Sequence, residues 1–280
     1  MSDRQLTIAG FQMLIAEDDI ESNESAIHRA INSARDAGAK FLLTPEASLS
    51  GYNSSFDGIS VSKATNRLAE HAKDLGVGLL LGTCYKESHR AVSFPYRLRS
   101  RDDSLRPTIQ EFCFNQVRVY TPDGRYLGRH SKIQMWNWPH FPGVGEEQVF
   151  ATSALRTFHW NGITFGVLIC NDLWGALWSR QPENLAYRLW EMGAEIIFHA
   201  VYAGFSKLGP NSYLESYQSM FAKVFNLPIV TAHAADPTRS VLCQSGVWNG
   251  EGERLCAVDR VGEKFFTHTI SLSPKVAGQS

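Results

Sequence analysis

The sequence predicts an α/β fold, and three observations indicate it. Apolar runs of strand length alternate with segments in which apolar residues recur at helical spacing. Glycines follow the helical segments, as expected where helices end. Short turn sequences separate several of the remaining apolar runs into pairs. No repeat, linker or low-complexity tract divides the 280 residues, so we expect a single domain over residues 1–280.

The first part of the chain repeats a strand and helix pattern. Residues 6–12 alternate in polarity like a strand, and residues 26–37 carry apolar side chains at helical spacing. A short apolar strand is predicted over 41–44, a second helix around 64–75 and a further strand over 77–85. This order predicts a βαβαβ unit with parallel strands.

Residues 86–110 interrupt this pattern. The segment contains five arginines and two prolines but little apolar periodicity, which predicts a loop inserted into the domain. Loops of this length are uncommon unless they have a function. The segment is therefore interpreted either as a lid or recognition loop, or as a solvated excursion on the surface.

Two hairpins and an alternation of helices and strands complete the chain. Pro122-Asp123-Gly124 and Asn161-Gly162 are turn sequences, because glycine accepts the positive φ that tight hairpin turns require. The elements that follow the second hairpin are a helix around 185–192, a strand over 195–200, a helix over 212–226, and closing strands over 227–233 and in segments from 245 to 273.

Composition excludes several classes of partner. The formal net charge is −1, the isoelectric point is about 6.8 and no concentrated basic segment is present, so neither nucleic acid nor an acidic membrane surface is an expected partner. Apolar stretches are too short to span a bilayer, and no signal peptide is visible. Five cysteines without a C-x-x-C pair indicate free thiols rather than a disulfide framework or structural zinc, which predicts a cytoplasmic protein.

Three reactive side chains stand at the ends of predicted strands. Cys170 ends the apolar run 163–169, Glu46 follows the strand at 41–44, and Lys132 follows the first hairpin. A thiol with a pKa near 8.5 needs a base or a nearby cation to act as a nucleophile at neutral pH. We expect Glu46 to take the thiol proton, while Lys132 and the backbone N–H of Asn171 stabilise negative charge.

Each of these residues has a plainer interpretation when taken alone. A cysteine in an apolar strand is usually an inert part of the core. A glutamate after a proline is usually solvated, and a single lysine usually lies at the surface. Their common position at strand ends is what favours a shared catalytic site.

Three motifs together resemble the nitrilase or carbon-nitrogen hydrolase superfamily. Leu43-Thr-Pro-Glu46-Ala-Ser-Leu-Ser-Gly51-Tyr52 is similar to its glutamate motif, Gly128-Arg-His-Ser-Lys132-Ile133 to its lysine motif, and Gly166-Val-Leu-Ile-Cys170-Asn-Asp172 to its cysteine motif. Further similar segments extend the resemblance over nearly the whole chain. It implies a four-layer α/β/β/α sandwich that assembles as a homodimer or higher homo-oligomer.

The resemblance also implies a mechanism. Glu46 is then the general base, Cys170 the nucleophile and Lys132 the stabiliser of the tetrahedral intermediate, with no metal or organic cofactor. The substrate is a small amide-like molecule, hydrolysed through a thioester. Candidates for substrate contacts are Tyr52, Trp136, Asn171, Trp174 and His199.

Two departures from the family pattern leave alternatives open. Residues 133–140 lack the second glutamate that many members carry there, so either Glu146 or Glu147 replaces it or the role is missing. In the latter case the chain is a nitrilase-like scaffold that binds without turnover. Cys170-Asn171-Asp172 resembles amidases and N-carbamoyl amino acid hydrolases more than nitrile-hydrolysing nitrilases, yet the arginines that bind a carboxylate in the carbamoyl hydrolases are absent from positions 173–175.

Overall fold

The computed structural model describes residues 4–88, 111–136, 145–146, 149–175, 183–206 and 212–272. Most of the loop predicted at 86–110 lies outside these residues. Its first three residues, 86–88, belong to a strand instead, because they pair with residues 111–113 of the next strand.

Helices occur in two pairs with one short helix between them. They are α1 (Ile20–Asp36), α2 (Gly58–Asp74), α3 (Asn171–Trp174), α4 (Leu185–Glu191) and α5 (Ser212–Phe225). The strands are β1 (Arg4–Leu14), β2 (Phe41–Leu43), β3 (Gly78–Ser88), β4 (Glu111–Tyr120), β5 (Tyr126–Ser131), β6 (Thr157–Trp160), β7 (Ile163–Ile169), β8 (Ile196–Val201), β9 (Phe205–Ser206), β10 (Ile229–Ala235), β11 (Ser240–Val241), β12 (Gly246–Trp248), β13 (Arg254–Ala257) and β14 (Lys264–Leu272).

The main strands form two sheets that are joined at one point. The first sheet has the order β14-β1-β2-β3-β4-β5, and the second has the order β6-β7-β8-β10-β12-β13. β1 leaves its partner β14 and pairs with β10 only at Met13↔Ala234 and Leu14↔Ala235. The predicted βαβαβ unit is confirmed, because β1, β2 and β3 are parallel neighbours.

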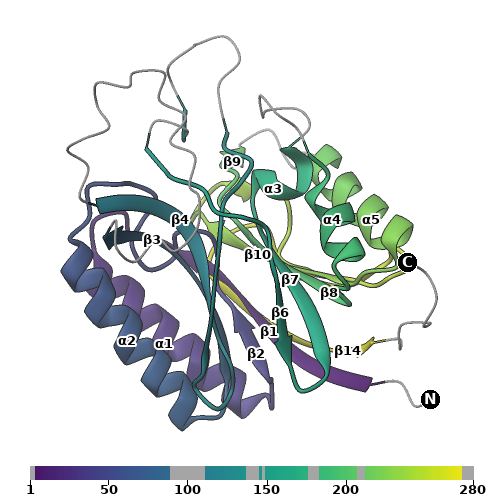
Figure 1. Ribbon diagram of the computed structural model, residues 1–280, viewed down its shortest axis with the longest axis horizontal. Coiled ribbons are helices and arrows are strands. Elements are labelled where there is room, and N and C mark those ends of the chain that lie inside the picture. Colours follow the sequence, from purple (N-terminus) through teal and green to yellow (C-terminus); the bar gives the residue numbers. More distant parts are fainter. Residues whose placement is uncertain are drawn as a thin grey trace.

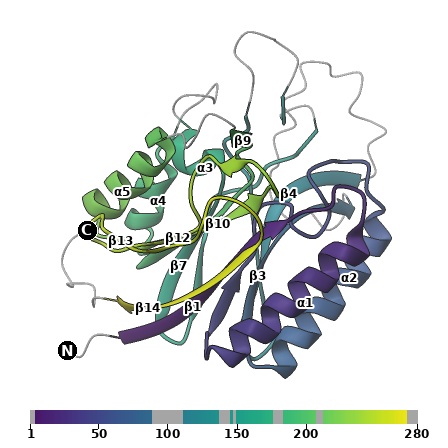
Figure 2. The same ribbon diagram turned by 180° about the vertical axis from the view of Figure 1, so that it is seen from behind.

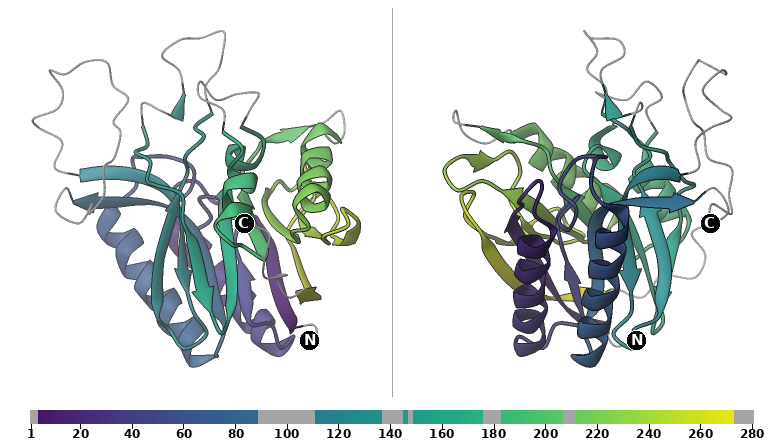
Figure 3. Two further views of the ribbon diagram at one scale, coloured as in Figure 1. Left: turned by 45° about the vertical axis from the view of Figure 1, so that its right-hand side comes forward. Right: turned by 90° about the vertical axis from the view of Figure 1, so that its left-hand side faces the viewer.

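The two sheets lie face to face between the helices. α1 and α2 cover the outer side of the first sheet, while α4 and α5 cover the outer side of the second (Figure 1). The opposite view and the turned views show the same order of layers (Figures 2 and 3). The molecule is therefore an α/β/β/α sandwich, as the sequence predicted.

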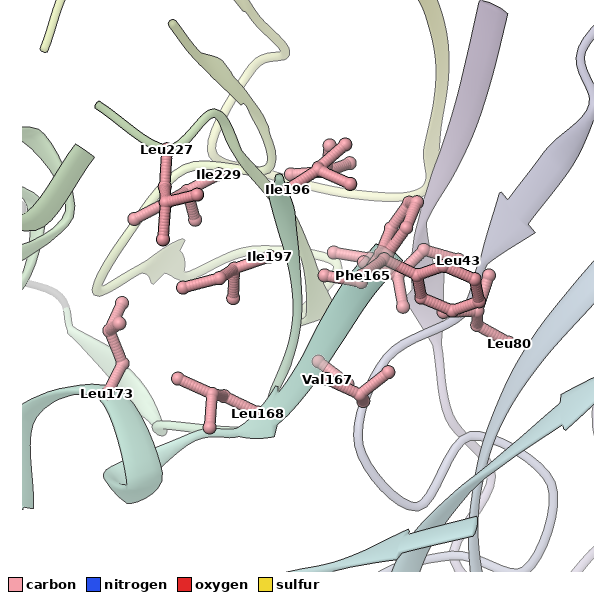
Figure 4. Packing of buried hydrophobic residues seen from close by; sticks show 14 of the residues in the cluster. Leu43, Leu80, Phe165, Val167, Leu168, Leu173, Ile196, Ile197, Leu227 and Ile229 are labelled. Atoms are coloured by element: carbon pink, nitrogen blue, oxygen red, sulfur yellow. The ribbon is translucent and has the colours of Figure 1, made fainter. Parts of the chain in front are cut away.

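The space between the sheets is filled by apolar side chains from both. Leu43 and Leu80 of the first sheet pack with Phe165 and Val167 of β7 in one buried cluster (Figure 4). Phe165 also contacts Phe41, with ring centroids 5.6 Å apart. Alternate residues of the same strands face the helices, as the period of two in a strand requires.

Local sequence explains how the main elements begin and turn. The side chain of Asp19 accepts a hydrogen bond from Ser22 N at the start of α1, and Asp57 accepts one from Ile59 N at the start of α2. The hairpin predicted at Asn161-Gly162 is confirmed, because Trp160 pairs with Ile163 across a two-residue turn with positive φ at both positions.

Three short elements were not predicted from the sequence. α3 spans four residues, and β9 and β11 pair over two residues each. Segments this short carry no readable periodicity. Among the described residues, no helix is long and apolar enough to cross a membrane.

Replacement of Phe165 tests the packing between the sheets. Phe165 is 1% exposed and contacts three other aromatic rings, so Phe165→Ala should lower the free energy of unfolding by about 3–5 kcal/mol. Urea unfolding monitored by circular dichroism measures this. Ile59→Ala on α2, where the side chain is 67% exposed, is the matched control and should change stability by less than about 0.5 kcal/mol. Equal effects of the two substitutions would contradict the assignment of Phe165 to the core.

Candidate active site

The turn that carries Glu46 is fixed against β3. Thr44 Oγ1 accepts a hydrogen bond from Gly82 N at 2.9 Å, and Ser48 Oγ donates to Gly82 O at 2.8 Å. A Cβ atom at Gly82 would lie 1.8 Å from Pro45 O, so only glycine permits this approach. Glu46 therefore projects from a rigid support although it stands in a turn.

The buried Glu46 carboxylate is held by three donors from different segments. Asn115 Nδ2 donates to Oε1 at 2.7 Å, and Lys132 Nζ donates to the same oxygen at 2.9 Å. The backbone N–H of Tyr202, just after β8, donates to Oε2 at 2.7 Å. These contacts bring both sheets to one carboxylate.

Lys132 follows β5 and is buried between two carboxylates. Its Nζ also donates to Glu146 Oε1 at 2.7 Å and to the hydroxyl of Tyr52 at 3.4 Å. Burial is the largest single influence and lowers the pKa of a lysine, but the charge and hydrogen bond of Glu46, together with Cys170 and Asp172, outweigh it and the pKa of Lys132 is raised. Lys132 therefore keeps its positive charge inside the protein.

Glu146, one of the two candidates for the missing second glutamate, contacts Lys132, whereas Glu147 lies outside the described residues. Glu146 Oε2 accepts a hydrogen bond from Trp136 N at 2.6 Å while Oε1 contacts Lys132. Burial and the nearby Glu46 carboxylate raise the pKa of Glu146 well above its usual value. Two carboxylates around one ammonium leave surplus negative charge, and the raised pKa relieves it by favouring the protonated form of Glu146.

Cys170 occupies a strained turn between β7 and α3. Its φ of 46° and ψ of −108° lie outside the usual regions for a residue with a side chain. Ala47, next to Glu46, has a φ of 56°, and the other described non-glycine residues with positive φ are asparagines, which tolerate it. Backbone strain of this kind tends to gather at active sites.

The electrostatic surroundings keep the Cys170 sulfur protonated at rest. Burial raises the pKa of the Cys170 thiol well above its usual value, and the charge of Glu46 raises it further. Lys132 acts in the opposite direction. A base must therefore remove the proton during reaction, and Glu46 is placed to act on this thiol.

His199 lies behind Cys170. Its Nε2 donates to the backbone oxygen of Cys170 at 3.0 Å, and its ring packs edge-on against Trp174. Burial lowers the pKa of His199 to about 4, so at neutral pH its single ring proton is the one donated to Cys170. His199 does not line the cavity in front of Cys170, which differs from the substrate contact expected from the sequence. It supports the backbone of the strained turn instead.

Asp172 joins the segment after Cys170 to the segment after Lys132. Its Oδ1 accepts hydrogen bonds from the backbone N–H groups of Ile133 and Gln134 at 2.9 and 2.7 Å. Its Oδ2 accepts from His130 Nε2 at 2.7 Å and from Ile169 N at 3.0 Å. Burial opposes ionisation of Asp172, but these hydrogen bonds outweigh it, so the pKa of Asp172 is lowered. The carboxylate thus clamps two catalytic segments together.

A cavity of about 740 Å³ opens in front of Cys170. Lys132, Glu146 and Cys170 all line it, and so do four of the predicted substrate contacts, namely Tyr52, Trp136, Asn171 and Trp174. Glu46 does not line the cavity and lies behind Lys132. The structure therefore gathers the predicted catalytic residues around one recess.

The described part of the chain contains no cluster of three or more His, Cys, Asp or Glu side chains that could hold a metal ion. Within the same residues, all five cysteines are unpaired.

Comparison with known proteins identifies the class. The family model described as carbon-nitrogen hydrolase matches residues 7–274, so the chain belongs to the carbon-nitrogen hydrolase family. The protein is accordingly an enzyme, a carbon-nitrogen hydrolase. No curated protein sequence is significantly similar to it.

Solved structures with the same fold include amidases of the nitrilase superfamily. An amidase from Nesterenkonia sp. has a TM-score of 0.73 at 18% identity, over 95% of this chain and 90% of that one. A mutant of that amidase with acrylamide added to its active-site cysteine has a TM-score of 0.72 at 18% identity, over 94% and 92% of the two chains. Glutamine-dependent NAD+ synthetase from Acinetobacter baumannii has a TM-score of 0.70 at 19% identity, over 95% of this chain and 45% of the synthetase, so this chain spans about half of that enzyme. At these identities the likeness shows the fold.

Several residues of the site were not found from the sequence. Asn115 lies inside β4, where a buried amide looks like any polar residue of a strand. The contribution of Tyr202 is a backbone N–H, which no side-chain pattern reveals. His130 had a signal, because it stands two residues before Lys132, at the spacing that places side chains on one face of an extended segment.

The pKa of Asp172 predicts how one substitution depends on pH. A carboxylate whose pKa is lowered by folding stabilises the protein above its unfolded pKa of about 3.9, and this contribution is lost as pH falls through the lower folded pKa. Asp172→Asn should lower the free energy of unfolding by about 3–5 kcal/mol at pH 7, with a smaller difference below about pH 4. Urea titrations between pH 3 and pH 7 measure it. Asp123→Asn at an exposed turn is the control, and a pH-independent deficit in Asp172→Asn would contradict the role of the ionised carboxylate.

Proposed function

We propose that the protein hydrolyses a non-peptide carbon–nitrogen bond of a small carboxamide or N-carbamoyl compound through a thioester on Cys170. The observation that carries the proposal is that Lys132, which is bound by Glu46 and Glu146, lines the same cavity as a thiol on a strained turn. A protonated thiol beside a carboxylate and a fixed ammonium suits nucleophilic attack on a carbonyl carbon.

Acylation of the enzyme begins with proton transfer. Glu46 accepts the thiol proton, the sulfur of Cys170 bonds to the carbonyl carbon, and the carbonyl electron pair moves to oxygen. The resulting oxyanion is stabilised by Lys132 and by the backbone N–H of Asn171, the first residue of α3. The carbon–nitrogen bond then breaks, and Glu46 returns the proton to the leaving ammonia or amine.

Deacylation reverses these roles with water in place of the amine. Glu46 takes a proton from water, the hydroxide oxygen bonds to the thioester carbon, and the carbon–sulfur bond breaks. The sulfur leaves with the proton from Glu46, and the carboxylic acid is released. Glu46 thus acts as base and acid in both halves of the cycle, which its fixed position between Asn115 and Tyr202 supports.

Glu146 weighs against a scaffold without turnover. That alternative was motivated by the missing second glutamate, and Glu146 contacts Lys132 at 2.7 Å. Hydrolysis of a nitrile is the other alternative, and it gives the same acid and ammonia but starts from a nitrile and consumes two water molecules. Release of acid from nitriles but not from the corresponding amides would support that alternative.

A homodimer or higher homo-oligomer in the cytoplasm also belongs to this proposal. Exposed apolar side chains on α4 and α5 support assembly through these helices, the most exposed being Val224 at 65%. Unpaired cysteines support a reducing compartment. Light scattering of the purified protein distinguishes the monomer from a dimer, and a monomer at micromolar concentration would contradict the assembly.

Trapping of the thioester tests the covalent mechanism. Brief incubation with an amide, followed by acid quench and peptide mass spectrometry, should show the acyl mass on Cys170 and on none of the other four cysteines. Cys170→Ala should abolish turnover, and Glu46→Gln should lower the acylation rate by about 10²- to 10⁴-fold because the thiol proton has no acceptor. Lys132→Met should lower it by at least about 10²-fold through loss of an oxyanion donor. Unchanged hydrolysis by folded Cys170→Ala would overturn the mechanism.

Paired substitutions distinguish the two glutamates that the sequence allowed. Glu146→Gln keeps the shape of the side chain but removes an ionisable carboxyl group beside Lys132, so kcat should fall by about 10- to 100-fold. Glu147→Gln, one residue further on, is the matched control and should retain activity. The opposite ranking would assign the role to Glu147.

A further inference from the structure

The walls of the cavity carry information about the substrate. We propose that the cavity selects uncharged carboxamides whose acyl group is large and apolar, of the size of an aromatic ring. The inference rests on the proposed function and narrows its substrate class, because it disfavours N-carbamoyl amino acids and other amides that bear a carboxylate.

The cavity is larger than the reacting group needs. Its volume of about 740 Å³ falls in the range of about 300–1,000 Å³ typical of pockets for drug-sized ligands. Most of its described wall is aromatic or aliphatic and comes from separate segments of the chain, including Tyr52, Trp136, Phe150, Trp174, Leu214 and Leu242. A small aliphatic amide would leave most of this apolar surface in contact with water.

Two of the cavity tyrosines bring paired rings to the wall. Tyr202 donates its hydroxyl proton to Glu17 at 2.7 Å, and the hydroxyl oxygen of Tyr52 accepts a hydrogen bond from Lys132 at 3.4 Å. The two rings lie side by side with centroids 5.2 Å apart. The hydroxyl of Tyr202 is therefore engaged with the protein, and both rings add apolar surface to the wall.

The side chains of Asn53 and Asn171 differ in how far the protein engages them. Asn53 donates to the backbone oxygen of Glu17 at 3.1 Å and accepts from Ser55 N at 2.9 Å, so its amide holds the cavity wall in place. Asn171 Nδ2 donates to Gln134 O at 3.1 Å, whereas its Oδ1 has no hydrogen-bond partner among the described residues. An unpaired acceptor of this kind suits an uncharged amide, which brings N–H donors, better than a carboxylate, which brings none.

The charge of the cavity disfavours a second carboxylate. Among the described residues that line it, Lys132 is the one cation, and Glu46 and Glu146 already hold it at 2.9 and 2.7 Å. A substrate carboxylate would enter without a partner and close to acidic groups. Burial of an unpaired carboxylate is costly in free energy, so such substrates should bind weakly.

Three amides that share the reacting group test the inference. Propanamide, 3-phenylpropanamide and succinamate differ only in carrying hydrogen, phenyl or carboxylate at the same carbon. Release of ammonia should give a kcat/KM about 10- to 100-fold higher for 3-phenylpropanamide than for propanamide, and lower for succinamate than for propanamide. Equal values for the three, or a preference for succinamate, would overturn the inference.

Binding to an inactive variant separates this inference from the proposed function. Isothermal titration of Cys170→Ala with the same three amides should give the same order of affinity, with 3-phenylpropanamide the tightest. If that order holds while the wild type releases no ammonia, the proposed hydrolysis fails and the ligand class stands. If the wild type hydrolyses all three and the inactive variant shows no order of affinity, the hydrolysis stands and the ligand class fails.

A positive charge in the cavity wall should shift the substrate preference from 3-phenylpropanamide toward succinamate. Leu242 lines the cavity, is partly exposed and takes no part in the catalytic contacts, so an arginine can be accommodated there. Leu242→Arg should raise kcat/KM for succinamate by at least about 10-fold and lower it for 3-phenylpropanamide. Leu255→Arg on β13, 40% exposed and outside the cavity wall, is the matched control and should leave both values unchanged. The same change in both variants would contradict a role of the wall in selection.

Discussion

The site depends on one buried positive charge. Lys132 is enclosed by protein, and its ammonium is stable there because Glu46 and Glu146 both contact it. A buried charge that loses its partner costs several kcal/mol, so the three side chains must be placed together or not at all. This constraint explains why a turn after β2, the end of β5 and the segment around residue 146 meet at one point. In the proposed mechanism the same charge stabilises the tetrahedral oxyanion, because a cation that is already fixed in place needs no rearrangement during the reaction.

Three sets of contacts hold the segments around Lys132 in place. Gly82 allows the Glu46 turn to press against β3, Asp172 binds the segments after Lys132 and Cys170, and His199 holds the backbone behind the nucleophile. Each support is a hydrogen bond or close contact between segments far apart in sequence. The strained conformations of Ala47 and Cys170 persist because such contacts fix their neighbours. The stability of the sandwich is thus what holds the reacting groups in position.

Sequence patterns predicted the architecture where local periodicity is strong. The βαβαβ unit, the hairpin at Asn161-Gly162 and the position of Cys170 at the end of β7 all follow from runs long enough to read. Glu146 remained one of two alternatives, because choosing between neighbouring glutamates requires the direction of each side chain. The hydrogen bonds that Asn115 and the N–H of Tyr202 donate to Glu46 could not be predicted from the sequence, because they form only when β4 and β8 lie beside the Glu46 turn. Local sequence patterns specify the helices and strands, whereas the contacts between the two sheets form only when the sheets pack together.

The pairing of β1 with β14 affects how the protein folds while the ribosome is still synthesising it. β1 is synthesised long before β14, and the pairing of the two strands joins Arg4 to Leu272 and Gln12 to Lys264. That edge of β1 stays without its partner until β14 has emerged, and contacts so distant in sequence form slowly. An unpaired strand edge is prone to join with other chains. A chain whose translation stops before β14 therefore keeps an unpaired β1 edge and is prone to aggregate, so complete synthesis of the chain protects it from aggregation.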